Sequence, residues 1–313
     1  MHPIEATGLV RRFGDVVAVD GVDLHVADGE IFGFLGPNGA GKSTTVRMLT
    51  TLLRPTGGTA TVAGHDVVTE AALVRRRIGV ALQDAAIDPL MTGRELLHLQ
   101  AVLHGIARRS ARQRGGELLE RVGLVAAGDR RVGTYSGGMR RRLDLALALV
   151  HEPAVLFLDE PTTGLDPTSR LTLWDEIRTL NAENGTAVFL TTQYLEEADE
   201  LAERVAIIDG GRIVEQGTPA ALKKAVGAPT LRIETDDVDR ALEVMSRFGE
   251  QRPARRGRVA IGLASGTAGM SEVVRALDEA GVVLHHLELD EPSLDDVFAE
   301  ATGRRLEGAE PGE

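Results

Sequence analysis

The sequence predicts an α/β protein with a parallel sheet core, an antiparallel β-layer before it and a small α+β unit after it. Two observations indicate the core. An apolar run at 31–35 leads into a glycine-rich loop and then into a helical pattern at 45–53. Further apolar runs alternate with helical segments, the order typical of parallel strands joined by crossover helices. The runs are at 154–158, 186–191 and 204–208, with helical segments at about 168–182 and 195–202.

Two other patterns extend this core within the first domain, which we expect at 1–228. Residues 4–30 alternate apolar and polar positions, which favours an antiparallel β-layer. From about 84 to 150 the pattern is helical and predicts a group of helices. Within it we expect one apolar helix side and a basic linker at 108–112. The apolar side would carry Leu96, Leu97, Leu99 and Leu103.

A Gly-Ala-Pro break at 227–229 marks the second domain, which we expect at 229–303. Its patterns read β-α-β-α-β, which predicts a small α+β domain. The segments are 230–234, 237–248, 258–263, 270–280 and 283–289. His285 and His286 are interpreted as strand residues, one facing in and one out, because they lack the spacing and companions of a metal site. We expect residues 304–313 to be disordered.

The glycine-rich loop has the spacing of a phosphate-binding loop. An ordinary glycine turn is the alternative, but the complete pattern between a strand and a helix favours phosphate binding. Glycines let backbone N–H groups turn toward phosphate oxygens, and the helix dipole favours an anion at the helix start. Lys42 would reach the β- and γ-phosphates, and the Ser43 hydroxyl would ligate Mg²⁺. The residues of this nucleotide site are Gly36, Pro37, Asn38, Gly39, Ala40, Gly41, Lys42, Ser43 and Thr44.

The apolar run at 154–158 ends in two acids, Asp159 and Glu160. A buried parallel strand delivers such groups to its C-terminal edge, where ligands bind in open α/β sheets. By itself, this pattern is more often the solvated end of a core strand. Together with the phosphate-binding loop, it favours a functional role for both acids. Asp159 would hold Mg²⁺, and Glu160 would orient and deprotonate the attacking water.

Between these motifs, Ser136, Gly137 and Gly138 begin another helical run. Alone, Ser-Gly-Gly is most often a turn. With the other two motifs in order, it closely resembles the signature loop of ATP-binding cassette (ABC) proteins, and the resemblance covers roughly residues 4–220. The resemblance implies the ABC ATPase fold, in which the helical segment at about 84–150 is an inserted helical lobe. It also implies ATP and Mg²⁺ as cofactors, and ATP hydrolysis coupled to transport. The basic triplets at 75–77 and 140–142 are interpreted as solvated helix faces.

The resemblance also assigns roles to residues that carry little signal alone. Gln83 is similar to the loop glutamine that senses Mg²⁺ and water. Asp166 lies in the loop that crosses to the partner subunit, and Phe13 stands where an aromatic ring stacks on adenine, although a core position is equally compatible. Gln193 replaces the histidine that contacts the γ-phosphate. An amide still donates a hydrogen bond but takes up no proton, so we expect hydrolysis to survive, at a reduced rate.

The C-terminal end adds a narrower resemblance. The segments 193–198 and 291–298 resemble the daunorubicin-resistance type of ATPase, which serves antibiotic and lipid exporters. Physically, Ser293 would cap a helix with an apolar face. This resemblance implies an energising subunit of a membrane exporter. Two copies would enclose two ATP molecules, so we expect an ATP-bound homodimer that works with separate permease subunits. The exported compound is not encoded here, because substrate contacts belong to the permease.

Composition agrees with this reading. The chain has 313 residues, no cysteine and a formal net charge of -12, which disfavours a nucleic-acid partner. No uncharged apolar run approaches the roughly 18 to 20 residues of a membrane span, and the N-terminus lacks signal-peptide features. We therefore expect a peripheral protein on the cytoplasmic side of the cell membrane, held by a permease.

Two alternatives remain. A subunit of an ABC importer would share the cassette but not the C-terminal motif. A soluble cassette ATPase acting on nucleic acid or ribosomes would carry a long coiled-coil interruption or a second cassette, and this sequence has neither.

Overall fold

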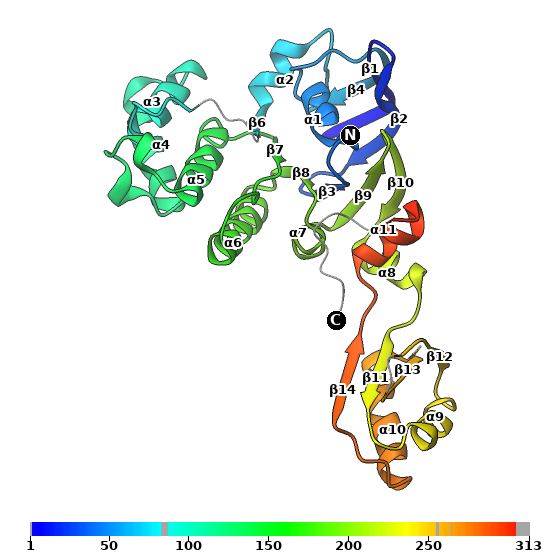
Figure 1. Cartoon of the computed structure of the whole chain (residues 1–313). Helices are drawn as coiled ribbons and strands as arrows, with labels where there is room; N and C mark the ends of the chain where they lie inside the picture. Colours follow the sequence, from blue (N-terminus) through cyan, green and yellow to red (C-terminus); the bar gives the residue numbers. More distant parts are fainter. Residues whose placement is uncertain (1, 83–86, 255–256, 264, 305–313) are drawn as a thin grey trace. The chain divides into compact units, whose positions relative to one another are not determined.

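The computed structural model describes residues 2–82, 87–254, 257–263 and 265–304. The chain divides into two compact units, Met1–Pro219 and Ala220–Glu313. The larger unit contains two sheets and a group of helices inserted between strands of the central sheet (Figure 1).

A six-stranded, mainly parallel sheet forms the centre of the larger unit. Its strand order is β10-β9-β3-β8-β7-β6, and the antiparallel strand β10 closes one edge. The strands are β3 (Ile31–Leu35), β6 (Ile78–Ala81), β7 (Val155–Asp159), β8 (Ala187–Thr192), β9 (Arg204–Asp209) and β10 (Arg212–Gly217). Every residue of β3, β7 and β8 is buried, as expected for parallel strands covered on both faces.

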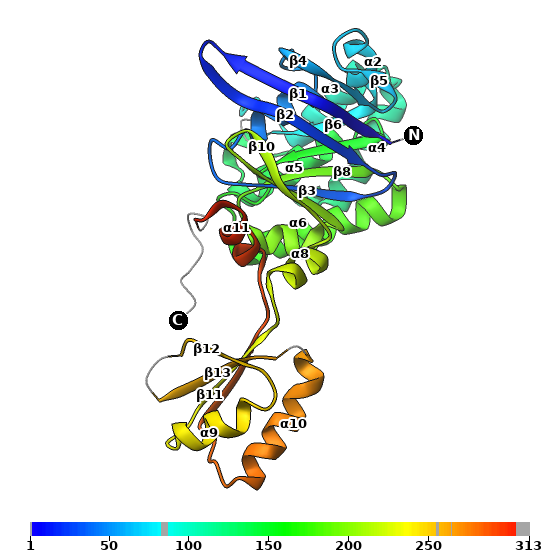
Figure 2. The ribbon, with the colours of Figure 1, turned by 90° about the vertical axis from the view of Figure 1, so that its right-hand side faces the viewer.

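An antiparallel sheet forms a second layer, in the order β2-β1-β4-β5 (Figure 2). The strands are β1 (Ile4–Phe13), β2 (Val16–Val26), β4 (Gly57–Val62) and β5 (His65–Asp66). Along β1 and β2, buried residues alternate with exposed ones, so one face packs inward. Buried side chains of this layer share one core with phenylalanine rings of the central sheet. In that core, the ring centroid of Phe189 lies 5.5–5.6 Å from those of Phe32, Phe34 and Phe157.

Helices cover the central sheet and build the lobe. The helices of the larger unit are α1 (Lys42–Leu49), α2 (Ala71–Arg77), α3 (Gly93–Leu103), α4 (Arg108–Arg121), α5 (Gly137–Ala148), α6 (Pro167–Asn184) and α7 (Leu195–Leu201), with short 3₁₀ turns at Val125–Ala127 and Val132–Thr134. Helices α3, α4 and α5 group together away from β1, β2 and β4 (Figure 1). Thr92 and Glu95 form a capping box that starts α3, and Gly185 ends α6 in the left-handed conformation.

The smaller unit contains a four-stranded antiparallel sheet in the order β12-β13-β11-β14. Its elements are α8 (Pro219–Val226, which begins at the boundary), β11 (Thr230–Glu234), α9 (Val238–Met245), β12 (Glu250–Arg252), β13 (Arg258–Gly262), α10 (Gly266–Glu279), β14 (His286–Asp290) and α11 (Leu294–Thr302). Apolar side chains of α9 and α10 share one core with β11 and β13. Ser293 caps α11 with Asp296 in a capping box, which confirms the predicted helix start.

The structure corrects three local expectations and adds one strand. Leu99 and Leu103 are 44% and 72% exposed, so only part of the predicted apolar side of α3 is buried. The basic segment 108–112 begins helix α4 rather than forming a linker. His285 precedes β14, and both it and His286 are exposed. Strand β12 was not predicted, because its three residues are polar and exposed.

None of the helices in the described part of the chain combines the length and the apolar character that crossing a membrane requires.

Gly79 allows a close approach between β6 and the end of α5. A Cβ atom at this position would lie 2.3 Å from the carbonyl oxygen of Ala148. Gly79→Ala should therefore lower the free energy of unfolding by about 1–3 kcal/mol, the range typical of overpacked cores. The fluorescence of Trp174, the single tryptophan, measures this in urea because α6 belongs to the larger unit. Gly116→Ala in α4, with nothing within 4 Å of its Cβ, is the control and should stabilise by up to about 1 kcal/mol.

Asp144 is a buried carboxyl in α5, and burial raises its pKa from 3.8 to about 7, against the lowering effect of Arg141. Between these two values the folded state binds more protons than the unfolded state. The contribution of Asp144 to the free energy of unfolding is therefore fully present below about pH 3.8 and is lost as pH rises through about 7. Asp144→Asn should remove this dependence, so that its urea midpoint exceeds the parental one by more at pH 8 than at pH 5.5. Asp175→Asn, at a 78% exposed position, is the control, and parallel curves for all three proteins would contradict the prediction.

Candidate functional site

The loop at 36–41 joins β3 to α1 in a conformation that its glycines allow. Gly39 and Gly41 have φ angles of +81° and +109°, a region that favours glycine. A Cβ atom on Gly36 would lie 2.2 Å from the carbonyl oxygen of Ile208, and one on Gly41 would lie 2.5 Å from that of Ala18. The chain therefore turns closely against β9 and β2 and enters α1 with unpaired N–H groups at the helix start.

Lys42 is the first residue of α1 and only 4% exposed. Its Nζ donates hydrogen bonds to the carbonyl oxygens of Gly36 at 2.6 Å and Pro37 at 3.1 Å, and lies 3.4 Å from Oε1 of Glu160. Burial lowers the pKa of Lys42, and the neighbouring Glu160 carboxylate opposes this shift. The loop thus encloses a buried cation, an arrangement suited to anionic oxygens.

Asp159 ends β7 beside the loop. Its Oδ1 accepts hydrogen bonds from the hydroxyl of Ser43 at 3.2 Å and from the hydroxyl of Thr191 on β8. These oxygens are the hard ligands that Mg²⁺ prefers. No cluster of three or more His, Cys, Asp or Glu side chains suited to a metal occurs among the described residues. Mg²⁺ at nucleotide sites needs only one or two carboxylates together with phosphates, so the residues present fit this ion.

Glu160 follows Asp159 and is 7% exposed. Its φ angle is +48°, which is uncommon for a residue other than glycine. Its backbone N–H donates to both oxygens of Thr191 at 3.1 Å, and the Thr163 hydroxyl donates to its Oε2 at 3.3 Å. The fold therefore directs the carboxylate toward Lys42 at the end of the phosphate loop.

The Ser-Gly-Gly residues stand at a helix start, as predicted. Ser136 is the N-cap of α5, and its Oγ accepts a hydrogen bond from the Met139 N–H. Gly138 lies against α6, because a Cβ there would be 3.0 Å from Oγ of Ser169. Asp166 caps α6 by accepting bonds from the N–H and hydroxyl of Ser169 at 3.0 and 2.6 Å. These bonds lower the pKa of Asp166.

Of the three remaining predicted site residues, the structure describes Phe13 and Gln193. Phe13 ends β1 with its ring 47% exposed, and the Arg11 guanidinium lies 4.4 Å from the ring centroid. Gln193 is half-buried between β8 and α7. Gln83 lies outside the described residues, directly after Leu82.

Two residues at the site were missed from the sequence. Arg141 is not part of a solvated helix face, because its guanidinium is 14% exposed and donates to the carbonyl oxygens of Asp159 and Glu160 at 2.8 Å. Thr191 is fully buried and bonds both acids. The parallel pairing of Asp159 with Thr191 places the threonine there, and a threonine at the end of a neighbouring core strand is a weak signal for it.

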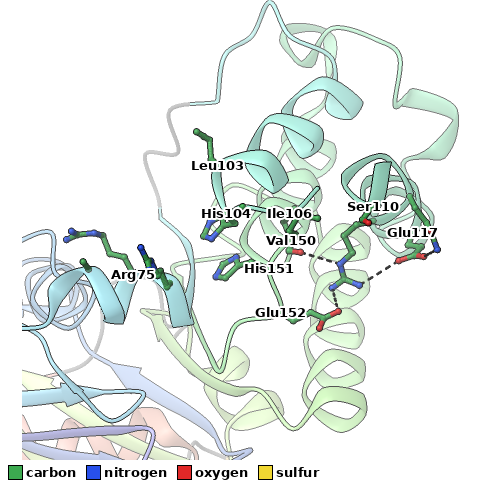
Figure 3. Close-up of a pocket in the computed structure, with 14 residues that line it drawn as sticks. Arg75, Leu103, His104, Ile106, Ser110, Glu117, Val150, His151 and Glu152 are labelled. Atoms are coloured by element: carbon green, nitrogen blue, oxygen red, sulfur yellow. Dashed lines mark hydrogen bonds and ion pairs between the residues drawn. The ribbon is translucent and has the colours of Figure 1, made fainter. Parts of the chain in front are cut away.

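A groove of about 1060 Å³ lies between α2 and the helical lobe, on the side of Arg75 and Arg76 (Figure 3). The rings of His104 and His151 stack in it, with centroids 3.7 Å apart. Burial and the neighbouring His104 lower the pKa of His151 to about 4. Burial also lowers the pKa of His104. Both shifts favour the uncharged ring, and Arg75 and Arg76 of α2 supply positive charge to the groove.

Family models match both parts of the chain. The ABC transporter model matches residues 19–163, and the model of the C-terminal domain of DrrA1-3-like ATP-binding proteins matches residues 217–302.

Similar proteins extend the match over the full length. The daunorubicin resistance ATP-binding protein DrrA2 of Streptomyces coeruleorubidus is 47% identical over all of this chain and 98% of its own length. The Nod factor export ATP-binding protein I of Burkholderia pseudomallei is 41% identical over 80% of this chain and 82% of its own. A dimeric bacterial ABC transporter cassette of known structure aligns with a TM-score of 0.63 and 25% identity, over 69% of this chain and 98% of that cassette. The chain belongs to the ABC transporter family, as an ATP-binding subunit of the daunorubicin-resistance type.

Proposed function

We propose that this ABC ATPase binds ATP with Mg²⁺ at the ends of β3 and β7 and thereby powers a separate membrane permease that exports antibiotic, drug or lipid-like compounds. The convergence of Lys42, Ser43, Asp159 and Glu160 carries the chemical part of the proposal. The similarity to proteins named for daunorubicin resistance and Nod factor export supports the direction of transport.

Each group at the site has a role that follows from its chemistry. N–H groups at 36–44 would hold the phosphates, and Lys42 would neutralise the charge that develops on the transferring phosphoryl group. Ser43 and Asp159 would hold Mg²⁺, whose chemistry is to neutralise charge on the phosphate oxygens. Glu160 would accept the proton of the attacking water. The exposed ring of Phe13 is available to stack on adenine.

The remaining sequence-predicted residues belong to the proposed dimer. Ser136, Gly137 and Gly138 of one copy would bind the γ-phosphate held by Lys42 of the other, and the loop with Asp166 would lie at the junction. The exposed start of α5 supports this, because Ser136 and Gly137 are exposed and a helix start attracts anions. Gln83 would sense Mg²⁺ and the water, and Gln193 would donate a hydrogen bond to the γ-phosphate.

The groove beside α2 is the proposed docking site for the permease. Its volume of about 1060 Å³ accommodates part of a helix, and the exposed Leu103 adds apolar surface at its rim. Docking there would hold the protein on the cytoplasmic side of the membrane. One wall of the groove consists of the end of α3, residues of α4 and the segment 150–152 that follows α5. Because α5 begins at the signature residues, closure of a dimer would move the groove.

Glu160→Gln tests the proposed function. The variant should bind ATP, lose turnover by about 100-fold or more and accumulate as a dimer, since the base is absent while the phosphate contacts remain. Steady-state phosphate release and light scattering at saturating ATP measure the two effects. Lys42→Ala is the matched variant: it should lose both turnover and ATP-driven dimerisation. Monomeric Glu160→Gln at saturating ATP, with and without the permease, would contradict the model.

Gln193 tests the contact at the end of β8. Gln193→Ala should lower turnover because it removes an amide donor, whereas Gln193→His should retain or raise it and add a pH dependence near about 6.5. The measurement is the ATPase rate of the three proteins from pH 6 to 8.5, with the cognate permease. Identical rates and profiles would show that position 193 does not touch the chemistry.

A further inference from the structure

Arg141 lies at the junction of three segments that the proposed mechanism uses. It belongs to α5, five residues after Ser136, and its side chain enters the space between Leu82 and the end of β7. The guanidinium donates five hydrogen bonds, to the carbonyl oxygens of Leu82 at 2.9 Å and of Asp159, Glu160 and Pro161 at 2.8 Å, and to the Asp144 carboxylate at 3.4 Å. A guanidinium has five N–H donors, so every donor of this side chain is used.

The neighbouring arginines of α5 behave differently. Arg140 is exposed. Arg142 donates to the carbonyl oxygen of Val122, away from the acidic strand end. The contact with the backbone of 159–161 is therefore specific to position 141 and is not a general property of the basic triplet.

The backbone that Arg141 holds is the strained part of the site. Glu160 has a φ angle of +48°, and residues in sparsely populated conformations persist only where the surroundings determine them. Thr191 fixes the N–H of Glu160 from one side. Arg141 binds the carbonyl oxygens before, at and after the turn from the other side.

We propose that Arg141 is a positioning residue for hydrolysis. It keeps Glu160 in the conformation that aims the carboxylate at the phosphate loop, and it ties this conformation to α5, whose N-cap is Ser136. The inference rests on the proposed role of Glu160 as the base. The Asp144 carboxylate accepts one of the five hydrogen bonds, at 3.4 Å. It therefore holds the guanidinium less firmly than the four carbonyl oxygens do.

The shape of the guanidinium makes Arg141→Lys the most informative variant. A lysine keeps the positive charge but offers three donors from one nitrogen, which cannot reach four carbonyl oxygens spread around a planar fork. Displacement of the base should lower kcat by about 10- to 100-fold. KM for ATP and the affinity for a fluorescent ATP analogue should change by less than about 2-fold, since Arg141 contacts none of the phosphate-loop residues that bind the nucleotide.

The experiment is steady-state phosphate release by the full chain, with urea unfolding followed by Trp174 fluorescence. Arg142→Lys is the matched control: it also replaces a fork that binds a carbonyl oxygen, and it should keep the parental kcat. In Arg141→Ala, added methylguanidinium should restore part of kcat, whereas methylammonium should not. Rescue by methylguanidinium would show that the Arg141→Ala protein is folded and lacks only the guanidinium group. Methylammonium carries the same charge without the planar shape, so its failure would show that the shape is what positions Glu160.

The outcomes are distinct. Parental kcat in Arg141→Lys, or losses of ATP affinity and of the urea midpoint that match the loss of kcat, would overturn the proposal. Glu160→Gln in the same assay separates the two levels of inference. If Glu160→Gln is inactive and Arg141→Lys is parental, only the role of Arg141 is wrong. If Glu160→Gln retains parental turnover, the base is misassigned and the positioning role is overturned with it.

Discussion

Parallel pairing of β3, β8 and β7 places the end of each strand at one edge of the central sheet. Leu35 lies opposite Thr192, and Asp159 lies opposite Thr191. The glycine-rich loop follows the first of these strands, and the two acids lie at the end of the third. Residues more than a hundred positions apart, such as Ser43 and Asp159, therefore meet within hydrogen-bond distance. The buried pair of Lys42 and Glu160 depends on this register, because a one-residue shift of a strand would turn its side chains to the other face of the sheet.

Lys42 and Glu160 form an ion pair that is buried on both sides. Removing a charge from water is costly, and a paired ion recovers that cost only with further hydrogen bonds. The Lys42 ammonium donates to two loop carbonyls, and the Glu160 carboxylate accepts a hydrogen bond from the Thr163 hydroxyl. Each charged group is therefore held by neighbouring polar groups as well as by the other charge. These contacts fix the positions of both charged groups, and fixed charges limit the reorganisation that catalysis would require.

The sequence predicted well wherever the signal is local. The buried strands read as continuous apolar runs, and Ser136 and Ser293 occupy the helix starts that cap chemistry suggests. It failed where the outcome depends on distant neighbours. Leu99 and Leu103 have the spacing of an apolar helix side, yet both are exposed in the described part of the chain. Arg141 looked like a solvated charge, because the carbonyl oxygens that it binds lie 18 to 59 positions away.

Glu160 shows how a buried ion pair can hold an unfavourable backbone conformation in place. Its backbone has a conformation that glycine and asparagine adopt at lower energy than other residues. Replacement by either would relieve this local strain, but it would also remove the carboxylate that pairs with the buried Lys42. Breaking a buried ion pair by removing one partner costs about 3–5 kcal/mol, whereas one strained residue costs about 1–3 kcal/mol. A library of chain variants screened for heat resistance alone would therefore be expected to keep glutamate here.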